Sequence, residues 1–131
     1  KEEIAKKSLK PTILYPKLVM ALIENEKINS LAHITGGGLT ENLPGSIPKD
    51  LAIKIDTGSW EFPDIFKWLE KEGDISKTDM YRIFNCGIGM VIFVDKDEVN
   101  VICERITKLG YKNFVIGELI KKENTDSVIY L

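Results

Sequence analysis

The segment HITGGGLTENLP, residues 33–44, decides how this chain is organised. It places three consecutive glycines directly after a short apolar run. A glycine inside regular structure costs roughly 0.5–1 kcal/mol relative to alanine, so three together indicate a sharp turn or a close backbone approach. The N–H groups of such a turn are also suited to binding an anion. We expect the rest of the chain to build its fold around this loop.

The residues on either side of the glycines predict the local structure. Residues 30–34 are typical of a buried strand that leads into the loop, and residues 39–43 fit a short helix that Pro44-Gly45 ends. The N–H groups and the dipole at the start of that helix favour a phosphate. The loop lacks the lysine of a P-loop and the spacing of a dinucleotide fingerprint. From the residues alone, a ligand-contacting loop and a purely structural turn both stay open.

Elsewhere, apolar periodicity predicts alternating helices and strands. In residues 1–9 the helical pattern is broken by Lys10-Pro11. The run at residues 85–94 fits a central strand covered on both faces, opened by Cys86. The last two strands read as a closing hairpin, which favours an α+β or mixed α/β layer fold. Further helices are expected at residues 16–25, 62–72, 76–82 and 99–109, and further strands at residues 51–56, 114–120 and 127–131.

Composition excludes several functional classes. The 131 residues carry a formal net charge of −2 with interspersed charges, which fits neither a nucleic-acid surface nor a membrane surface. No apolar run approaches the length of a membrane span, so the cytosol is the default compartment. One histidine and two distant cysteines supply too few ligands for zinc, and we expect no metal site. Cys86 and Cys103 are expected to be reduced core residues.

Two polar residues near the glycines have alternative roles. His33 is the only histidine, and it is either a proton donor to a ligand or a satisfied core histidine. Asn85 either caps a turn or meets a polar ligand. Carboxylates such as Glu41 show no spacing typical of a catalytic pair, and no nucleophile stands beside a base. Residue chemistry alone therefore indicates a binding domain rather than a complete catalyst.

Two long motifs together resemble a known family. Residues 33–44 and residues 80–90, MYRIFNCGIGM, closely resemble the C-terminal domain of aminoimidazole ribonucleotide synthetases, also called phosphoribosylformylglycinamidine cyclo-ligases. Residues 9–15, LKPTILY, look like that family's entry into this domain, and Trp60-x-Phe62-Pro63 looks like its middle segment. The four motifs span essentially the whole chain in the same order, so the match is specific.

The resemblance implies a fold and a domain organisation. The family's C-terminal domain is a three-layer α/β/α arrangement with a partial ferredoxin-like sheet, and residues 1–131 would correspond to that domain. An N-terminal domain, absent here, supplies most of the residues that bind ATP and Mg²⁺ and the main homodimer contacts. The active site lies in the cleft between the two domains. We therefore expect the isolated chain to be inactive.

The resemblance also implies a reaction in de novo purine biosynthesis. ATP phosphorylates the formyl oxygen of formylglycinamidine ribonucleotide, and the amidine-side nitrogen then closes the imidazole ring to give aminoimidazole ribonucleotide. The alternatives are another ATP-using member of the superfamily, such as formylglycinamidine ribonucleotide synthetase, selenophosphate synthetase or a hydrogenase-maturation protein, or a non-enzymatic module that binds a phosphate ligand. The segment at residues 84–90 favours the cyclo-ligase.

Matching positions give the candidate site. One departure is Gly45, where many relatives have an arginine. If that arginine contacts the ligand, this protein either replaces it, with Lys49 as the candidate, or binds more weakly. His33 is the candidate catalytic residue, and the candidates for substrate or phosphate binding are Thr35, Gly36, Gly37, Gly38, Glu41, Asn42 and Asn85.

Overall fold

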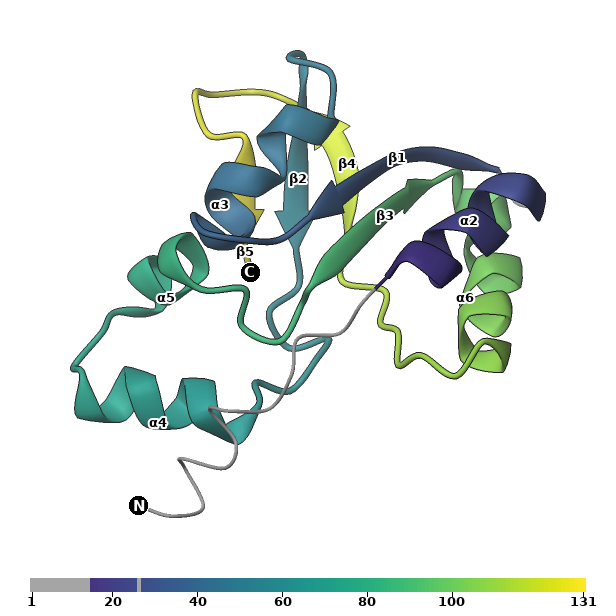
Figure 1. Cartoon of the computed structure of the whole chain (residues 1–131). Helices are drawn as coiled ribbons and strands as arrows, with labels where there is room; N and C mark the ends of the chain where they lie inside the picture. Colours follow the sequence, from purple (N-terminus) through teal and green to yellow (C-terminus); the bar gives the residue numbers. More distant parts are fainter. Residues whose placement is uncertain (1–14, 26) are drawn as a thin grey trace.

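The computed structural model describes residues 15–25 and 27–131 (Figure 1), so the features expected in residues 1–14 lie outside the described part. In that part, helices and strands alternate in an α+β arrangement, which confirms the expected fold class. The helices are α2 (Pro16–Asn25), α3 (Gly38–Asn42), α4 (Asp64–Glu72), α5 (Lys77–Ile83) and α6 (Val99–Lys108), with 3-10 turns η1 (Pro44–Ser46) and η2 (Lys96–Glu98). The strands are β1 (Ile28–His33), β2 (Leu51–Ile55), β3 (Met90–Val94), β4 (Gly117–Lys121) and β5 (Val128–Tyr130).

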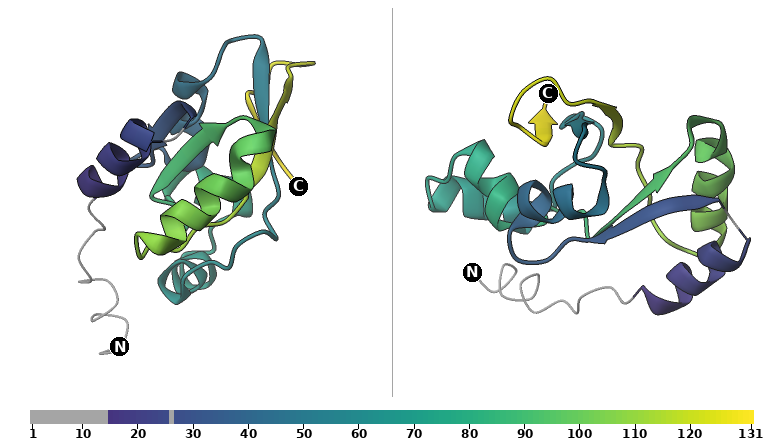
Figure 2. Two further views of the ribbon diagram at one scale, coloured as in Figure 1. Left: turned by 90° about the vertical axis from the view of Figure 1, so that its right-hand side faces the viewer. Right: turned by 90° about the horizontal axis from the view of Figure 1, so that it is seen from above.

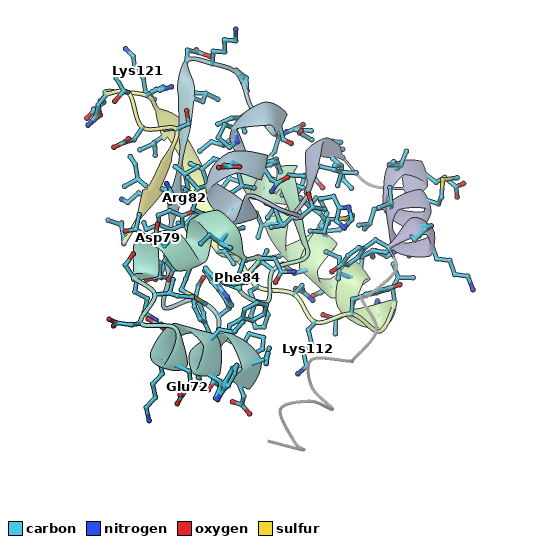
Figure 3. All side chains as sticks on the ribbon, turned by 60° about the vertical axis from the view of Figure 1, so that its left-hand side comes forward. Glu72, Asp79, Arg82, Phe84, Lys112 and Lys121 are labelled. Atoms are coloured by element: carbon cyan, nitrogen blue, oxygen red, sulfur yellow. The ribbon has the colours of Figure 1, made fainter. Side chains whose placement is uncertain are left out.

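The strands form two small sheets. One sheet pairs β1 with β3 in an antiparallel manner, and the other has the order β4-β2-β5. Helices α2 and α6 lie together at one end of the molecule, and α4 and α5 lie at the other (Figures 1 and 2). At the second end, the rings of Phe66 and Phe84 are 5.9 Å apart and join α4 to the end of α5. Figure 3 labels Phe84 beside the end of α5. This arrangement leaves the loop between β1 and α3 beside α5.

Strand β3 separates two apolar clusters. Its side chains alternate, so that Val91 and Phe93 join the main core while Ile92 and Val94 pack against the cluster between α2 and α6. The expectation of a strand covered on both faces is confirmed. The expectation of a central strand is wrong, because β3 pairs with β1 in a two-stranded sheet.

The expectation that the last two strands pair as a closing hairpin is also wrong. Strands β4 and β5 both pair with β2, on opposite sides, and β5 runs parallel to it. Three of the five side chains of β2 are buried, so it suits a central position better than an edge. Turn-forming residues between two strands do not show whether the strands pair with each other or with opposite sides of a third strand. Residues 114–116, expected in the strand, precede it.

The residues before β3 form a turn rather than the start of a strand. Cys86 and Gly87 both have positive φ, 52° and 94°, as the central residues of a type I′ turn do. The N–H of Ile88 donates to the carbonyl of Asn85 at 2.9 Å and closes the turn. The carbonyl of Cys86 accepts a hydrogen bond from the indole Nε1 of Trp60 at 3.0 Å. Cys86 is therefore fully buried, as the sequence predicted. It lies in a turn, however, and not in the predicted strand.

Buried thiol and phenol groups make the fold sensitive to alkali. Burial raises the pKa of Cys86 from 9.0 to about 12 and that of Tyr130 from 10.0 to about 12. Because folding raises both pKa values, the neutral Cys86 and Tyr130 side chains stabilise the folded state fully below about pH 9. This contribution to the free energy of unfolding is lost as the pH rises toward 12. We expect the free energy of unfolding in urea to fall above about pH 9, and Cys86→Ala to delay that fall to about pH 10. A constant value up to pH 11 would contradict this.

Candidate functional site

The two long sequence motifs meet at the glycine loop. The N–H of Ile34 donates to the carbonyl of Gly89 at 3.0 Å and extends the pairing of β1 with the segment before β3. Gly38 lies against the carbonyl groups of Tyr81 and Phe84 at the end of α5, so close that a β-carbon at Gly38 would stand 2.5 Å from the Phe84 oxygen. Segments more than 40 residues apart in the sequence thus form one surface.

Asn42 holds the glycine loop in its conformation. Its Nδ2 donates to the carbonyls of Gly38 at 2.7 Å, Gly36 at 3.1 Å and Thr35 at 3.4 Å. Its Oδ1 accepts a hydrogen bond from the Thr35 hydroxyl at 3.3 Å. The structure therefore gives Asn42 a role in positioning the loop, which the sequence pattern did not reveal.

The same contacts orient two backbone N–H groups. In a trans peptide the C=O and the following N–H point in opposite directions. Because the carbonyls of Thr35 and Gly36 turn toward Asn42, the N–H groups of Gly36 and Gly37 turn away from it. The N–H of Gly38 is used internally, donating to the Thr35 carbonyl at 3.1 Å. Two adjacent N–H groups on the far side of an exposed loop are an arrangement that suits an anion.

Glu41 adds a negative charge to this loop. Gly37 has a φ of 93°, and a β-carbon there would stand 2.8 Å from the β-carbon of Glu41. A carboxylate repels a phosphate, so Glu41 fits a hydroxyl or amine of a ligand better than an anion. Helix α3 is short, as expected, and its five residues give it only a small dipole to add to anion binding.

His33 lies at the end of β1, next to the loop. The side chains of Ala32 and Ile34 are buried, and the alternation of the strand leaves His33 exposed, so it is not a core histidine. Its ring centroid is 6.0 Å from that of Tyr15 in an edge-on contact. The Tyr15 ring also contacts Gly89, where a side chain would collide with it. Tyr15 is a neighbour of the site that the sequence pattern did not single out.

Asn85 caps the turn that follows α5. Its Oδ1 accepts a hydrogen bond from the N–H of Gly87 at 2.9 Å. This is one of the two roles that the sequence left open. Within the described residues its Nδ2 has no hydrogen-bond partner.

The chain is similar to known proteins over almost its whole length. Residues 1–129 match the family model described as AIR synthase related protein, C-terminal domain. The chain belongs to this family. The resemblance seen in the sequence is thereby confirmed.

Two curated relatives are similar to this chain over nearly its whole length. The phosphoribosylformylglycinamidine cyclo-ligase of Geobacter metallireducens is 45% identical over 126 residues, which are 95% of this chain. That of Pseudothermotoga lettingae is 43% identical over 123 residues, or 94% of this chain. In each case the match spans 36% of the relative. The chain thus covers about a third of the length of these relatives.

The departure from the family pattern at Gly45 lies apart from the glycines. Gly45 sits in η1, with open space around its α-carbon. It borders a groove of about 450 Å³ whose lining includes Asn29 and Phe93 but none of the three glycines. Lys49 does not line this groove either, so the structure gives no support to its replacing an arginine there.

The part of the chain that the structure describes comprises residues 15–25 and 27–131. None of its helices is long and apolar enough to span a membrane. In the same residues, no three side chains of the His, Cys, Asp and Glu types come together where they would hold a metal ion.

Proposed function

We propose that this chain is the C-terminal domain of an ATP-dependent cyclo-ligase that converts formylglycinamidine ribonucleotide to aminoimidazole ribonucleotide in the cytoplasm. Membership of the family described as AIR synthase related protein, C-terminal domain, and relatives named phosphoribosylformylglycinamidine cyclo-ligase support this proposal. Because the chain corresponds to about a third of those relatives, an N-terminal domain would complete the active site and form the homodimer.

The observation that carries the ligand-binding role is the set of Asn42 hydrogen bonds. They direct the N–H groups of Gly36 and Gly37 away from Asn42, where they would bind a phosphate of the ribonucleotide or of ATP. Gly38 supplies the close packing that fixes the loop, and Thr35 supplies a hydroxyl that anchors Asn42.

The remaining candidates surround this phosphate position. Glu41 would accept a hydrogen bond from a ligand hydroxyl, and the Nδ2 of Asn85 would donate one to a ligand oxygen. His33 is exposed beside the loop, where its ring would donate a proton or a hydrogen bond to the reacting group. All three are assigned by position and by the donor or acceptor that each presents.

The donor set fits ATP and Mg²⁺ only partly. Mg²⁺ is usually held by one or two carboxylates together with substrate phosphates and water. Glu41 is the one carboxylate of the glycine loop, and no three-ligand cluster occurs in residues 15–25 and 27–131. We assign Mg²⁺ and most contacts to ATP to the N-terminal domain. There ATP supplies the phosphoryl group that activates the formyl oxygen.

The isolated chain is expected to be inactive. Purified residues 1–131, given formylglycinamidine ribonucleotide, ATP and Mg²⁺, should form no aminoimidazole ribonucleotide above the background without enzyme. The physical reason is that one wall of the interdomain site is missing. Turnover by the chain alone at rates typical of enzymes would contradict the two-domain proposal.

Gly36 offers a direct test of the phosphate site. It is exposed, its φ is ordinary and nothing lies within 4 Å of a β-carbon placed there, so Gly36→Val should change stability by less than about 0.5 kcal/mol. In the full-length enzyme the valine would crowd the anion position. We expect the KM for the phosphorylated substrate to rise about tenfold, as for the loss of one charge-assisted hydrogen bond.

Gly45→Val is the matched control. Gly45 is equally exposed and equally free of neighbours, but it lies outside the glycine loop. Its KM should stay at the parent value. If Gly36→Val also leaves KM unchanged, the loop is a structural turn and the assignment of the phosphate site is wrong.

A further inference from the structure

Tyr15 lies directly before α2, and its ring contacts the imidazole of His33 at the end of β1. The two ring centroids are 6.0 Å apart and the ring planes meet at 74°, which is an edge-on geometry that aromatic pairs prefer. His33 is exposed, and an exposed side chain at the end of a strand can adopt several rotamers. The contact with Tyr15 therefore restricts the direction in which the imidazole points.

Tyr15 is itself held by a second ring. It stacks on Tyr111, which follows the end of α6, with centroids 6.4 Å apart and an interplanar angle of 28°. The N–H of Tyr111 donates to the carbonyl of Ile106 at 3.2 Å, which fixes Tyr111 to that helix. Both tyrosines pack against the apolar cluster between α2 and α6. A side chain whose own rotamer is locked by packing can position a neighbouring functional group.

Gly89 provides the space that the Tyr15 ring occupies. His33 pairs with Met90 in the antiparallel ladder, so Gly89 lies one residue from the partner of His33. A β-carbon at Gly89 would collide with the Tyr15 hydroxyl and stand 3.2 Å from its Cζ. The φ of Gly89 is ordinary, so its backbone conformation does not require glycine. The structure thus gives one reason for a glycine at this position, which is room for Tyr15 beside His33.

We propose that Tyr15 is a positioning residue for the reaction, which holds the His33 imidazole beside the glycine loop in the orientation that meets the reacting group. This inference rests on the role of His33 in the proposed function. His33 would touch the substrate, whereas Tyr15 would act only through His33. Loss of the Tyr15 ring should therefore lower kcat and leave KM unchanged, because the phosphate contacts of the loop N–H groups do not involve it.

Steady-state kinetics of the full-length enzyme test this role. Tyr15→Leu removes the ring and should lower kcat about fivefold at constant KM, whereas Tyr15→Phe keeps the ring and should retain about half of kcat or more. Ile102→Val is the control, because it loosens the same cluster between α2 and α6, of which His33 is not a member. Its kcat should stay at the parent value. The proposal is wrong if Tyr15→Leu keeps the parent kcat, or if Ile102→Val lowers kcat as much.

A double-mutant cycle separates this inference from the proposed function. If Tyr15 acts through His33, Tyr15→Leu should cause no further loss of kcat in an enzyme that already carries His33→Ala. A further loss of about fivefold would show that Tyr15 acts by another route and would overturn the inference. Full activity of His33→Ala alone would remove His33 from the chemistry, and this inference with it, but would leave the assignment of the phosphate site standing.

Gly89→Ala tests the same contact from the opposite side. Its methyl group would collide with the Tyr15 hydroxyl and displace the ring, so kcat should fall about threefold. Tyr15→Phe removes that hydroxyl. The enzyme with both Gly89→Ala and Tyr15→Phe should therefore regain the kcat of Tyr15→Phe alone. A double variant as slow as Gly89→Ala would show that Gly89 acts through something other than Tyr15, and would contradict the proposal.

Discussion

Replacement of Gly38 by alanine is expected to lower the free energy of unfolding by at least about 4 kcal/mol, or to prevent folding. Gly38 has a φ of 57° and lies against the carbonyls of Tyr81 and Phe84. A β-carbon would collide with both main-chain groups, and they cannot move without displacing the end of α5. Urea unfolding followed by circular dichroism measures the change.

Gly36→Ala is the control for this prediction. It adds the same methyl group to the same loop, but at a position with ordinary φ and open space. Its free energy of unfolding should stay within about 0.5 kcal/mol of the parent. Similar losses for the two variants would mean that the close approach of Gly38 to α5 does not determine the stability of this region.

Asn42→Asp is expected to cost about 2–4 kcal/mol of stability and to reduce kcat/KM of the full-length enzyme by more than about tenfold. The substitution keeps the shape of the side chain but replaces the amide donor by a carboxylate oxygen. That oxygen would face the carbonyls of Thr35, Gly36 and Gly38, which now accept hydrogen bonds from Nδ2. Three acceptors would then meet a negative charge, and the loop would leave its present conformation.

Asn85→Asp is the matched control, because the Asn85 side chain accepts a hydrogen bond from the backbone whereas the Asn42 side chain donates to it. The Oδ1 of Asn85 accepts from the N–H of Gly87, and an aspartate oxygen preserves that bond. Its stability should change by less than about 0.5 kcal/mol, measured in urea. Equal destabilisation by the two aspartates would show that the direction of the Asn42 hydrogen bonds does not matter.

Local sequence signals placed most helices well. Helix α2 begins at Pro16 and ends at Asn25 as its proline and apolar spacing predicted. The Ser76 hydroxyl accepts from the N–H of Asp79 at 3.2 Å and caps α5, which begins where the sequence predicted a helix. Gly110, with a φ of 88°, follows the end of α6. Each signal depends on residues within one or two helical turns.

Strand partners were not predictable in the same way. The apolar run that ends in β3 appeared to begin at Asn85, yet the chain turns at Cys86 and Gly87 before pairing starts at Met90. The final two strands were expected to pair with each other and instead flank β2. Both errors concern hydrogen bonds between segments that are distant in sequence, for which local periodicity carries no information.

The sequence by itself determined the family, the ends of most helices and the position of a loop that requires glycine, because each of these depends on residues close together in the chain. Only the tertiary structure decided which glycine is forced by packing. Packing requires a glycine at position 38, because α5 lies against it, and does not require one at position 36. It likewise decided that Asn42 donates to the loop while Asn85 accepts within its turn. The physical reason is that steric exclusion and hydrogen-bond direction arise only when separate segments meet.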